Sequence, residues 1–421
     1  QGSGLLAQVL KSDPMTVASA SLSAILLLHG CLQVQSLAQG SGLLFVGSGG
    51  CDGCDAGCKE GPKVDEQLVR AMAVDRHGNA HEESDFSVRV LGMPAWLTTR
   101  QMKGQPQCLW VVLADKDIIV PVGFDGGRPI VGLPSGTGGS APVFAGVTSN
   151  GQVLLVANYH GPDNANTSKG AGVASFRIQQ DCSLVLADTK AHSGTSIDPI
   201  RQRGAHVHSF VPARGGLAYA CDLGQDLIFT YAVSADGKLT ELHRAHAEPG
   251  SGPRHLVEHP TAPFVFVISE MGESVTSWRQ KSDGSLQLLD TVYLKKRGPV
   301  TGICNDGSKA AEIAILPDGS AIFATNRGGE NVVHVIEVQG DGVLKLSQTV
   351  QAPAYPRGMM LAFDGSLLLV AGESKTELAA YSVGERGHLT PTGFNPSWLP
   401  PHPVSLALLE DAPQAQRVLI S

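Results

Sequence analysis

Short apolar runs alternate with polar, glycine-containing turns over most of the chain. Four segments of this kind align with one another, namely 216–242, 263–289, 320–346 and 366–392. Each has an apolar run, a polar turn, a stretch of alternating apolar and polar residues, a glycine-containing turn and a short last strand. Alternation with period two and glycine-containing hairpin turns are typical of antiparallel β-strands. The pattern therefore predicts β-structure built from a repeated unit.

A further apolar strand precedes each aligned segment, so that the repeat contains four strands and recurs about every 45 residues. These preceding strands are 208–212, 254–260, 312–317 and 358–363. Because each strand is short and the next lies close in sequence, the four strands of one repeat are expected to form one antiparallel sheet.

Less regular copies of the repeat begin at Pro94 and Pro142, and an N-terminal copy from about residue 43 lacks its first strand. The segment His402–Leu409 has the pattern of that missing strand. A strand lent from one end of the chain to a sheet at the other end closes a ring and hides its edges. The prediction is an all-β, seven-bladed β-propeller over residues 39–421, with its ring closed by the N- and C-terminal strands.

Composition narrows the classes of partner. The 421 residues carry a formal net charge of −8, and 42% of them are hydrophobic, which is ample for a folded core. The longest basic run is Lys295–Arg297. Nucleic-acid binding needs clustered Lys and Arg, so no nucleic-acid partner is expected.

The first 38 residues have the pattern of a processing segment rather than of a blade. An apolar centre at 22–32 is followed by small residues at Ser36 and Ala38, as in a cleavable signal. This apolar centre is too short for a membrane span. We expect an N-terminal extension over 1–38, either a signal or a targeting segment.

Three of the eight cysteines, Cys51, Cys54 and Cys58, form a CxxCxxxC cluster. Such a cluster could hold zinc or an iron–sulfur centre, but it lacks a second CxxC pair. We interpret it as an insertion loop with free or paired thiols, and we expect no metal site.

Polar residues stand out where the apolar strands begin or end. In a propeller, the start of the first strand and the end of the second open on the same mouth of the central channel. The residues at the start of first strands are His206, His208, Arg254, His255, Glu312, Arg357 and His402. Those at the end of second strands are His160, Asp222, Glu270, Asn326, Arg327 and Glu373.

A ring of Arg, Glu and His at one mouth suggests an anionic ligand and acid/base chemistry, because buried charges are costly unless they are paired or used. Propellers also pair polar residues between blades, so each of these residues has a structural alternative. Asp222 fits a turn acceptor and Asn326 a loop cap. His206 and His208 belong to an HxH pair, whose side chains face opposite ways on an ideal strand.

These residues lie in stretches that resemble the lactonase family of seven-bladed propellers, which includes propeller-type 6-phosphogluconolactonases and the carboxy-cis,cis-muconate cyclase. The matching stretches are "HVHSFVP", "ACDLGQDLIFTY", "GSGPRHLVEHP", "AAEIAILPDGSAIFATNRG" and "YPRGMMLAFDGSLLLVAGES". The family most often has Pro between the two histidines, where this chain has Val207.

The resemblance implies a metal-independent lactone hydrolase that needs no cofactor. The catalytic cluster then consists of His206, His208, Arg254, Glu270 and Arg327. By position, the substrate-binding residues are His160, His255, Glu312, Arg357 and Glu373, with Arg357 the candidate for a 6-phosphate. His208 or Glu270 would be the base, and Arg254 or Arg327 the oxyanion partner.

The expected substrate is a small anionic molecule, 6-phosphogluconolactone of the oxidative pentose phosphate route. Two other hypotheses stay open: a muconate-type lactonising enzyme and a non-catalytic ligand-binding propeller. The resemblance implies a cytoplasmic protein, whereas a cleaved signal would make it secreted or organellar. We expect a monomer or a weak homo-oligomer.

Overall fold

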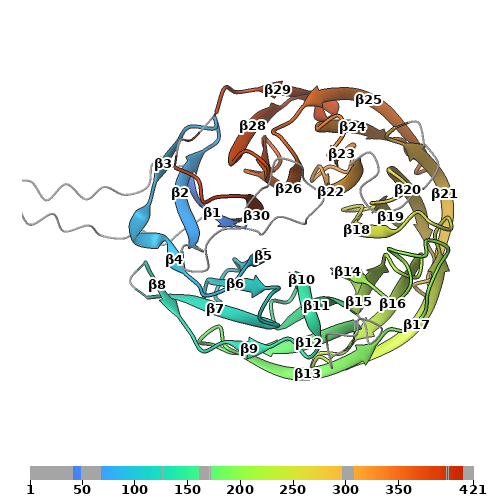
Figure 1. Cartoon of the computed structure of the whole chain (residues 1–421), viewed down its shortest axis with the longest axis horizontal. Coiled ribbons are helices and arrows are strands. Elements are labelled where there is room, and N and C mark those ends of the chain that lie inside the picture. Colours follow the sequence, from blue (N-terminus) through green and yellow to red (C-terminus); the bar gives the residue numbers. More distant parts are fainter. Residues whose placement is uncertain are drawn as a thin grey trace, which may run out of the picture. The chain divides into compact units, whose positions relative to one another are not determined.

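The computed structural model describes residues 41–48, 68–125, 127–160, 170, 172–295, 308–394, 396 and 398–410, all within one compact unit that spans Leu37–Pro413. Within this unit the strands form seven antiparallel sheets arranged as blades around a centre (Figure 1). The N-terminal extension, the cluster of Cys51, Cys54 and Cys58, and the end of the chain lie outside the described residues. The predicted all-β, seven-bladed propeller is confirmed.

Blades 1 to 3 contain the following strands. Blade 1 has β1 (Ser41–Ser48), β2 (Leu68–Asp75), β3 (Ala80–Glu82), β4 (Val88–Arg89) and β30 (Pro403–Leu409). Blade 2 has β5 (Pro94–Arg100), β6 (Cys108–Leu113), β7 (Ile118–Asp125), β8 (Arg128–Val131) and β9 (Ser135–Gly136). Blade 3 has β10 (Ser140–Val147), β11 (Val153–His160), β12 (Gly172–Ile178) and β13 (Leu184–Ala191).

Blades 4 to 7 each have four strands. Blade 4 has β14 (Val207–Ala213), β15 (Leu217–Asp222), β16 (Leu227–Val233) and β17 (Leu239–His246). Blade 5 has β18 (Pro253–Glu258), β19 (Phe264–Ser269), β20 (Ser274–Gln280) and β21 (Leu286–Tyr293). Blade 6 has β22 (Lys309–Ile315), β23 (Ala321–Arg327), β24 (Val332–Val338) and β25 (Leu344–Gln351). Blade 7 has β26 (Pro356–Ala362), β27 (Leu367–Gly372), β28 (Glu377–Val383) and β29 (Leu389–Pro391).

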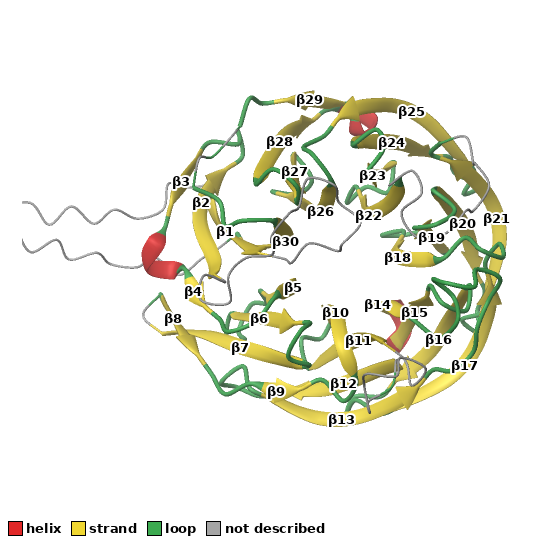
Figure 2. Ribbon diagram, in the orientation of Figure 1, coloured by secondary structure: helices red, strands yellow, loops and turns green. Residues whose placement is uncertain are grey.

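Helical structure among the described residues is limited to 3₁₀ turns at Ser84–Phe86, Arg214–Gly216 and Glu385–Gly387 (Figure 2). Strand burial follows the radius of the ring. Second strands such as β19 are buried along their whole length, whereas the outer strand β17 is buried only at Leu239 and is otherwise exposed or half-buried. A strand covered on both faces is a continuous apolar run, and one with a wet face alternates, as the sequence pattern does.

The ring is closed by the last strand of the chain. β30 pairs antiparallel with β1, with Phe45 opposite Ala407 and Leu44 opposite Leu408. The predicted loan of a C-terminal strand to the first blade is therefore confirmed. Blade 1 therefore contains strands from both ends of the sequence, and their pairing joins the first and last parts of the ring.

Neighbouring blades are joined by hydrogen bonds at equivalent positions. Asp188 on β13 accepts from the backbone N–H of Leu239 in the next blade at 2.9 Å, and Asp290 on β21 accepts from Leu344 at 2.8 Å. The hairpin glycine Gly237, with φ of 85°, approaches so closely that a Cβ there would lie 2.8 Å from the Ala187 Cβ. These hairpins require glycine both for their backbone conformation and for contact with the preceding blade.

A disulfide joins blades 2 and 3. Cys108 begins β6, Cys182 lies in the turn before β13, and their Cα atoms are 5.7 Å apart. Both residues are buried, and Trp110 donates through Nε1 to the Cys182 carbonyl at 2.9 Å. The two cysteines are 74 residues apart in the chain, so no local spacing pattern predicts their pairing.

We expect the Cys108→Ala, Cys182→Ala double variant to lose about 2–4 kcal/mol of free energy of unfolding, since the cross-link restricts the unfolded chain. Urea denaturation with and without a thiol reductant measures this loss. The reductant should destabilise the natural protein and leave the double variant unchanged. If the reductant destabilised both proteins equally, the stabilising disulfide would not be Cys108–Cys182 and the effect would come from other cysteines.

Candidate active site

The predicted convergence of strand starts and strand ends on one mouth is present in the structure. Lys309, the first residue of β22, is paired with Arg327, the last residue of β23. Ser140 is likewise opposite His160 in blade 3, and Val207 lies opposite Asp222 in blade 4. The first strand of one blade and the second strand of the same blade thus present their polar ends side by side.

A β-bulge lies at this end of every first strand. The register with the second strand shifts across the intervals 94–96, 142–144, 207–209, 253–255, 310–313, 356–358 and 403–405. The residues inside these intervals include Val143, His208, Arg254, Glu312 and Arg357. Bulges re-aim side chains and are common beside active sites. The repeated bulge thus supplies four of the polar residues at this mouth.

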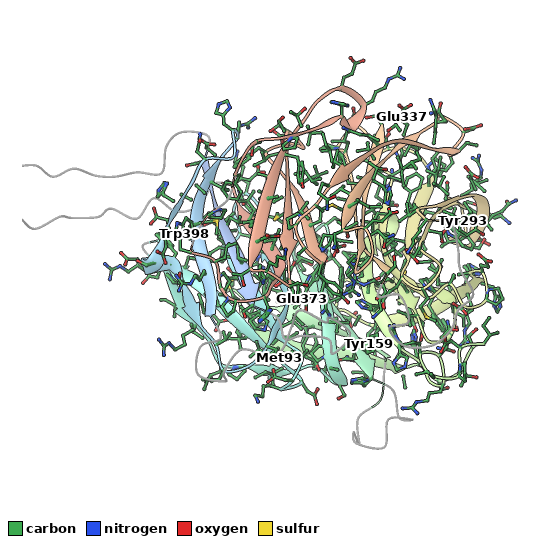
Figure 3. The ribbon with its side chains drawn as sticks, turned by 45° about the horizontal axis from the view of Figure 1, so that its top comes forward. Met93, Tyr159, Tyr293, Glu337, Glu373 and Trp398 are labelled. Carbon is green, nitrogen blue, oxygen red and sulfur yellow. A yellow bond between two sulfur atoms is a disulfide. The ribbon has the colours of Figure 1, made fainter. Side chains whose placement is uncertain are left out.

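A pocket of about 400 Å³ opens at this mouth, within the size range of small-molecule sites. Five consecutive blades and the connection from blade 3 to blade 4 contribute its walls. The lining residues are Ala141, Val143, Tyr159, His160, Arg201, His208, Glu270, Lys309, Arg327 and Arg357. Tyr159 and Glu373 lie toward the centre of the molecule, whereas Tyr293 and Glu337 lie at its periphery (Figure 3).

Glu270 is the electrostatic centre of the pocket. Its Oε1 accepts from Arg201 Nη2 at 2.7 Å, and its Oε2 accepts from Arg254 Nε and Arg327 Nη2, each at 3.2 Å. The side chain is 2% exposed. Burial raises the pKa of Glu270, but Arg201, Arg327, Lys309 and Arg254 outweigh it and hold that pKa well below its usual value. Glu270 is therefore ionised and fully engaged by arginines.

The arginines around Glu270 differ in their surroundings. Arg254 is 3% exposed, and burial together with the nearby Arg327 lowers its pKa to about 10. Its Nη1 donates to the Ala311 carbonyl. The Glu270 carboxylate instead raises the pKa of Arg201, which lines the pocket. Arg254 therefore belongs to the buried frame of the site, whereas Arg201 and Arg327 line the pocket.

His208 lines the pocket and is 7% exposed. Burial, followed by the charges of Arg254 and the neighbouring His255, lowers its pKa well below the ordinary histidine value. The ring is therefore neutral at neutral pH, and one of its nitrogens can accept a proton. His208 is the histidine of the HxH pair that faces the pocket.

His206 precedes β14 and lies beside the pocket rather than in its wall. Its ring stacks on Tyr159 with centroids 4.6 Å apart, and its Nδ1 lies 3.0 Å from the Tyr159 carbonyl, to which it must donate. Asp222 accepts from the His206 backbone N–H at 2.9 Å and from Gly224 at 3.1 Å. Asp222 is thus the turn acceptor that the sequence suggested.

The remaining predicted residues fall into two groups. His160, Glu270, Arg327 and Arg357 line the pocket with His208. His255 and Glu312 lie buried behind His208, and Glu373 holds Arg357 through a 3.0 Å ion pair. His402 hydrogen bonds through Nδ1 to the Glu373 carbonyl at 3.0 Å.

Three polar lining residues, Tyr159, Arg201 and Lys309, were not predicted from the sequence. Lys309 begins a first strand and Tyr159 lies near the end of a second, so the same positional rule could have found both. Arg201 lies in the connection between blades 3 and 4, outside any strand. No spacing rule identifies a residue in an irregular connection.

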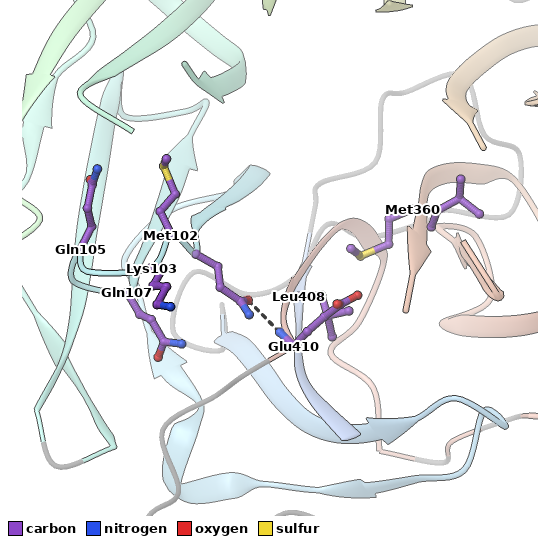
Figure 4. Close-up of a pocket in the computed structure, with 9 residues that line it drawn as sticks. Met102, Lys103, Gln105, Gln107, Met360, Leu408 and Glu410 are labelled. Carbon is purple, nitrogen blue, oxygen red and sulfur yellow. Dashed lines mark hydrogen bonds between the residues drawn. The ribbon is translucent and has the colours of Figure 1, made fainter. Parts of the chain in front are cut away.

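A second cavity, of about 800 Å³, lies at the opposite ends of first strands β5, β26 and β30 (Figure 4). Its lining includes Met360, Leu408, Lys103 and Glu410, and Gln101 accepts from the Glu410 backbone N–H at 2.8 Å. It lacks the grouped arginines and histidines of the first pocket.

No group of three or more His, Cys, Asp or Glu is arranged to hold a metal ion within the part of the chain that the structure describes. Over the same residues, no helix is long and apolar enough to cross a membrane.

The site and the propeller fold together define a lactonase-type protein. A model of the family described as "Lactonase, 7-bladed beta-propeller" matches residues 63–405. The chain belongs to this family, as its resemblance in sequence predicted.

Among relatives, a 6-phosphogluconolactonase of Bacillus subtilis is 28% identical over 259 residues, which are 60% of this chain and 69% of that protein. The structure of a periplasmic gluconolactonase of Pseudomonas aeruginosa aligns with a TM-score of 0.72 at 21% identity, covering 88% of this chain and 99% of that one. A candidate 6-phosphogluconolactonase of Bacteroides fragilis gives a TM-score of 0.72 at 22% identity, with 89% and 99% coverage.

We expect Glu270→Gln to lower the free energy of unfolding by about 3–5 kcal/mol, because it leaves three buried or half-buried arginines without their shared carboxylate. Thermal or urea denaturation measures the change. The matched control is Glu337→Gln, whose carboxylate lies 3.9 Å from the exposed Arg386 and which should change stability by less than about 1 kcal/mol. Equal effects of the two substitutions would contradict the central role of Glu270.

Proposed function

We propose that this protein hydrolyses a sugar δ-lactone that carries an anionic group, with 6-phosphogluconolactone as the leading candidate. The observation that carries the proposal is a neutral, buried His208 in one pocket with Arg201, Lys309, Arg327 and Arg357. The relative from Bacillus subtilis bears the name of this activity. Family membership supports a lactone as the substrate class.

His208, rather than Glu270, is the general base in this proposal. Both Glu270 oxygens accept from arginines, and the pKa of Glu270 is held well below its usual value, so this carboxylate is a weak base. The neutral imidazole of His208 removes a proton from water as the water oxygen forms a bond to the lactone carbonyl carbon.

Arg327 stabilises the negative charge that develops on the carbonyl oxygen, because it lines the pocket and is already oriented by Glu270. The tetrahedral intermediate then collapses: the bond between the carbonyl carbon and the ring oxygen breaks. The proton held by His208 passes to that ring oxygen, and the product is a hydroxy acid, whose new carboxylic acid group releases its proton to solvent. These steps use only side chains of this chain.

We expect lactone hydrolysis that survives chelator treatment and that falls about 10²–10⁴-fold in His208→Gln, the range that a lost general base produces. Freshly prepared 6-phosphogluconolactone and gluconolactone are the substrates, with spontaneous hydrolysis subtracted. His334→Gln removes another buried histidine, on β24 and bonded to Thr349, and should leave the rate unchanged. Rates on both lactones no higher than those of His208→Gln would contradict the proposal.

The compartment bears on the choice between phosphorylated and unphosphorylated lactones. Disulfides such as Cys108–Cys182 persist in oxidising compartments and are rare in the cytosol. This pairing supports the secreted or organellar alternative over the cytoplasmic one. If the protein is secreted, it would meet little sugar phosphate, which favours a second candidate substrate, an unphosphorylated sugar lactone.

Arg357 distinguishes the two substrates. Its side chain is 24% exposed, lines the pocket and is oriented by Glu373 at 3.0 Å, so it can donate to a phosphate. If the phosphorylated lactone is the substrate, Arg357→Met should raise its KM about 10–10²-fold and leave the KM for gluconolactone unchanged. Arg244→Met, on the exposed outer strand β17, is the control. Phosphate recognition by Arg357 would be contradicted if the natural protein had the same KM for the two lactones and Arg357→Met left both KM values unchanged.

A further inference from the structure

A chain of three side chains leads away from the pocket behind His208. His208 Nδ1 lies 3.2 Å from His255 Nε2, and His255 Nδ1 lies 2.7 Å from Glu312 Oε1. His208, His255 and Glu312 come from β14, β18 and β22, the first strands of three consecutive blades. All three are buried, with exposures of 7%, 2% and 5%.

The carboxylate at the far end decides where the protons lie. A carboxylate only accepts, so His255 Nδ1 must carry a proton and donate it to Glu312. In a neutral imidazole the other nitrogen then has a lone pair, so His255 Nε2 accepts. The 3.2 Å contact with His208 therefore requires a proton on His208 Nδ1, which leaves the lone pair on His208 Nε2.

Arg254 is the competing contact at His255 Nδ1, because a guanidinium can only donate. Its Nη1 lies 3.3 Å from His255 Nδ1, farther than the 2.7 Å of Glu312 Oε1, and this Nη1 donates to the Ala311 carbonyl. The Glu312 carboxylate lies 4.0 Å from the same guanidinium. The His255 ring packs edge-on against Trp96 and Phe144, whose ring centroids lie 5.3 and 5.6 Å away. The two aromatic rings contact each other as well, with centroids 4.6 Å apart, so they form one apolar wall beside His255.

We propose that His255 and Glu312 are positioning residues that keep the His208 proton on Nδ1, so that Nε2 accepts a proton from water in the pocket. This inference rests on the proposed function. It differs from the expectation that His255 and Glu312 touch the substrate, because both lie behind His208. When His208 takes up a proton, the Glu312 carboxylate stabilises the resulting positive charge through His255.

The chain from His208 through His255 to Glu312, called the relay below, has a distinctive effect on the pH dependence of catalysis. The titratable or charged groups that surround His208 are Tyr159, Arg254, His255, Glu270 and Arg357. Burial, with Arg254 and His255, lowers the pKa of His208, while Glu270 raises it. Glu312 acts through His255, whose pKa it raises against the larger effect of burial. Removal of the Glu312 charge should therefore lower the pKa of His208 further.

Glu312→Gln tests the relay with little change of shape. A glutamine amide can donate to His255 Nδ1, which permits the reversed order and a proton on His208 Nε2. We expect kcat to fall about 10²-fold with a KM within a factor of two, and the acid limb of the kcat profile to move to lower pH. His334→Gln should change neither. An unchanged kcat, or a lower kcat without a shift of the acid limb, overturns the relay.

The tautomer can be read without any substrate. Nitrogen-15 NMR of the histidine-labelled natural protein, with the His208 signals assigned by their loss in His208→Gln, should show the proton on Nδ1 at neutral pH. The same spectrum of Glu312→Gln should show the proton on Nε2 or a mixture of both forms. A natural protein with the proton on Nε2 overturns the proposal. If the protein hydrolyses no lactone, the proposed function fails while this spectrum still decides the relay.

Discussion

The bulge at the start of each first strand is the feature on which the site depends. It inserts extra residues at one place in the repeat, and in blades 4, 5 and 7 these residues are His208, Arg254 and Arg357. An ideal strand would send alternate side chains to opposite faces. The bulge breaks this alternation at one end of the strand only. A rigid, apolar sheet can therefore present polar groups to the channel mouth without placing polar groups in its core.

The ring then sets the distances between these groups. No blade contains the site alone, because the pocket takes its walls from blades 3 to 7. Pairing of β1 with β30 closes the ring, and hydrogen bonds such as that from Leu239 to Asp188 join one blade to the next. The three members of the relay come from successive blades, so its 3.2 and 2.7 Å contacts depend on the angle between blades.

The difference between features that lie within one repeat and contacts that form between blades explains how much could be predicted from the sequence. Repeats, turn glycines and the shared blade are local patterns, so the fold and the mouth at which polar residues gather could be predicted. Which of His206 and His208 faces the pocket could not be predicted, because the alternation of apolar and polar residues gives no sign of a bulge. The hydrogen bonds of three arginines to Glu270 and the position of His255 behind His208 arise from contacts between blades, so they could not be predicted either. Arg201 enters from an irregular connection, and Cys108 meets Cys182 only because blades 2 and 3 pack together.

The charge balance of the pocket explains why it suits an anion and a neutral base at once. Glu270 is shared by three guanidiniums, and Lys309 and Arg357 add further positive charge at the same mouth. An excess of cations attracts an anionic ligand, and it also disfavours a proton on any nearby histidine. A histidine placed there alone would stay neutral but would accept a proton poorly. A second carboxylate set behind it, at Glu312, offsets that penalty at the base without neutralising the cations that face the ligand.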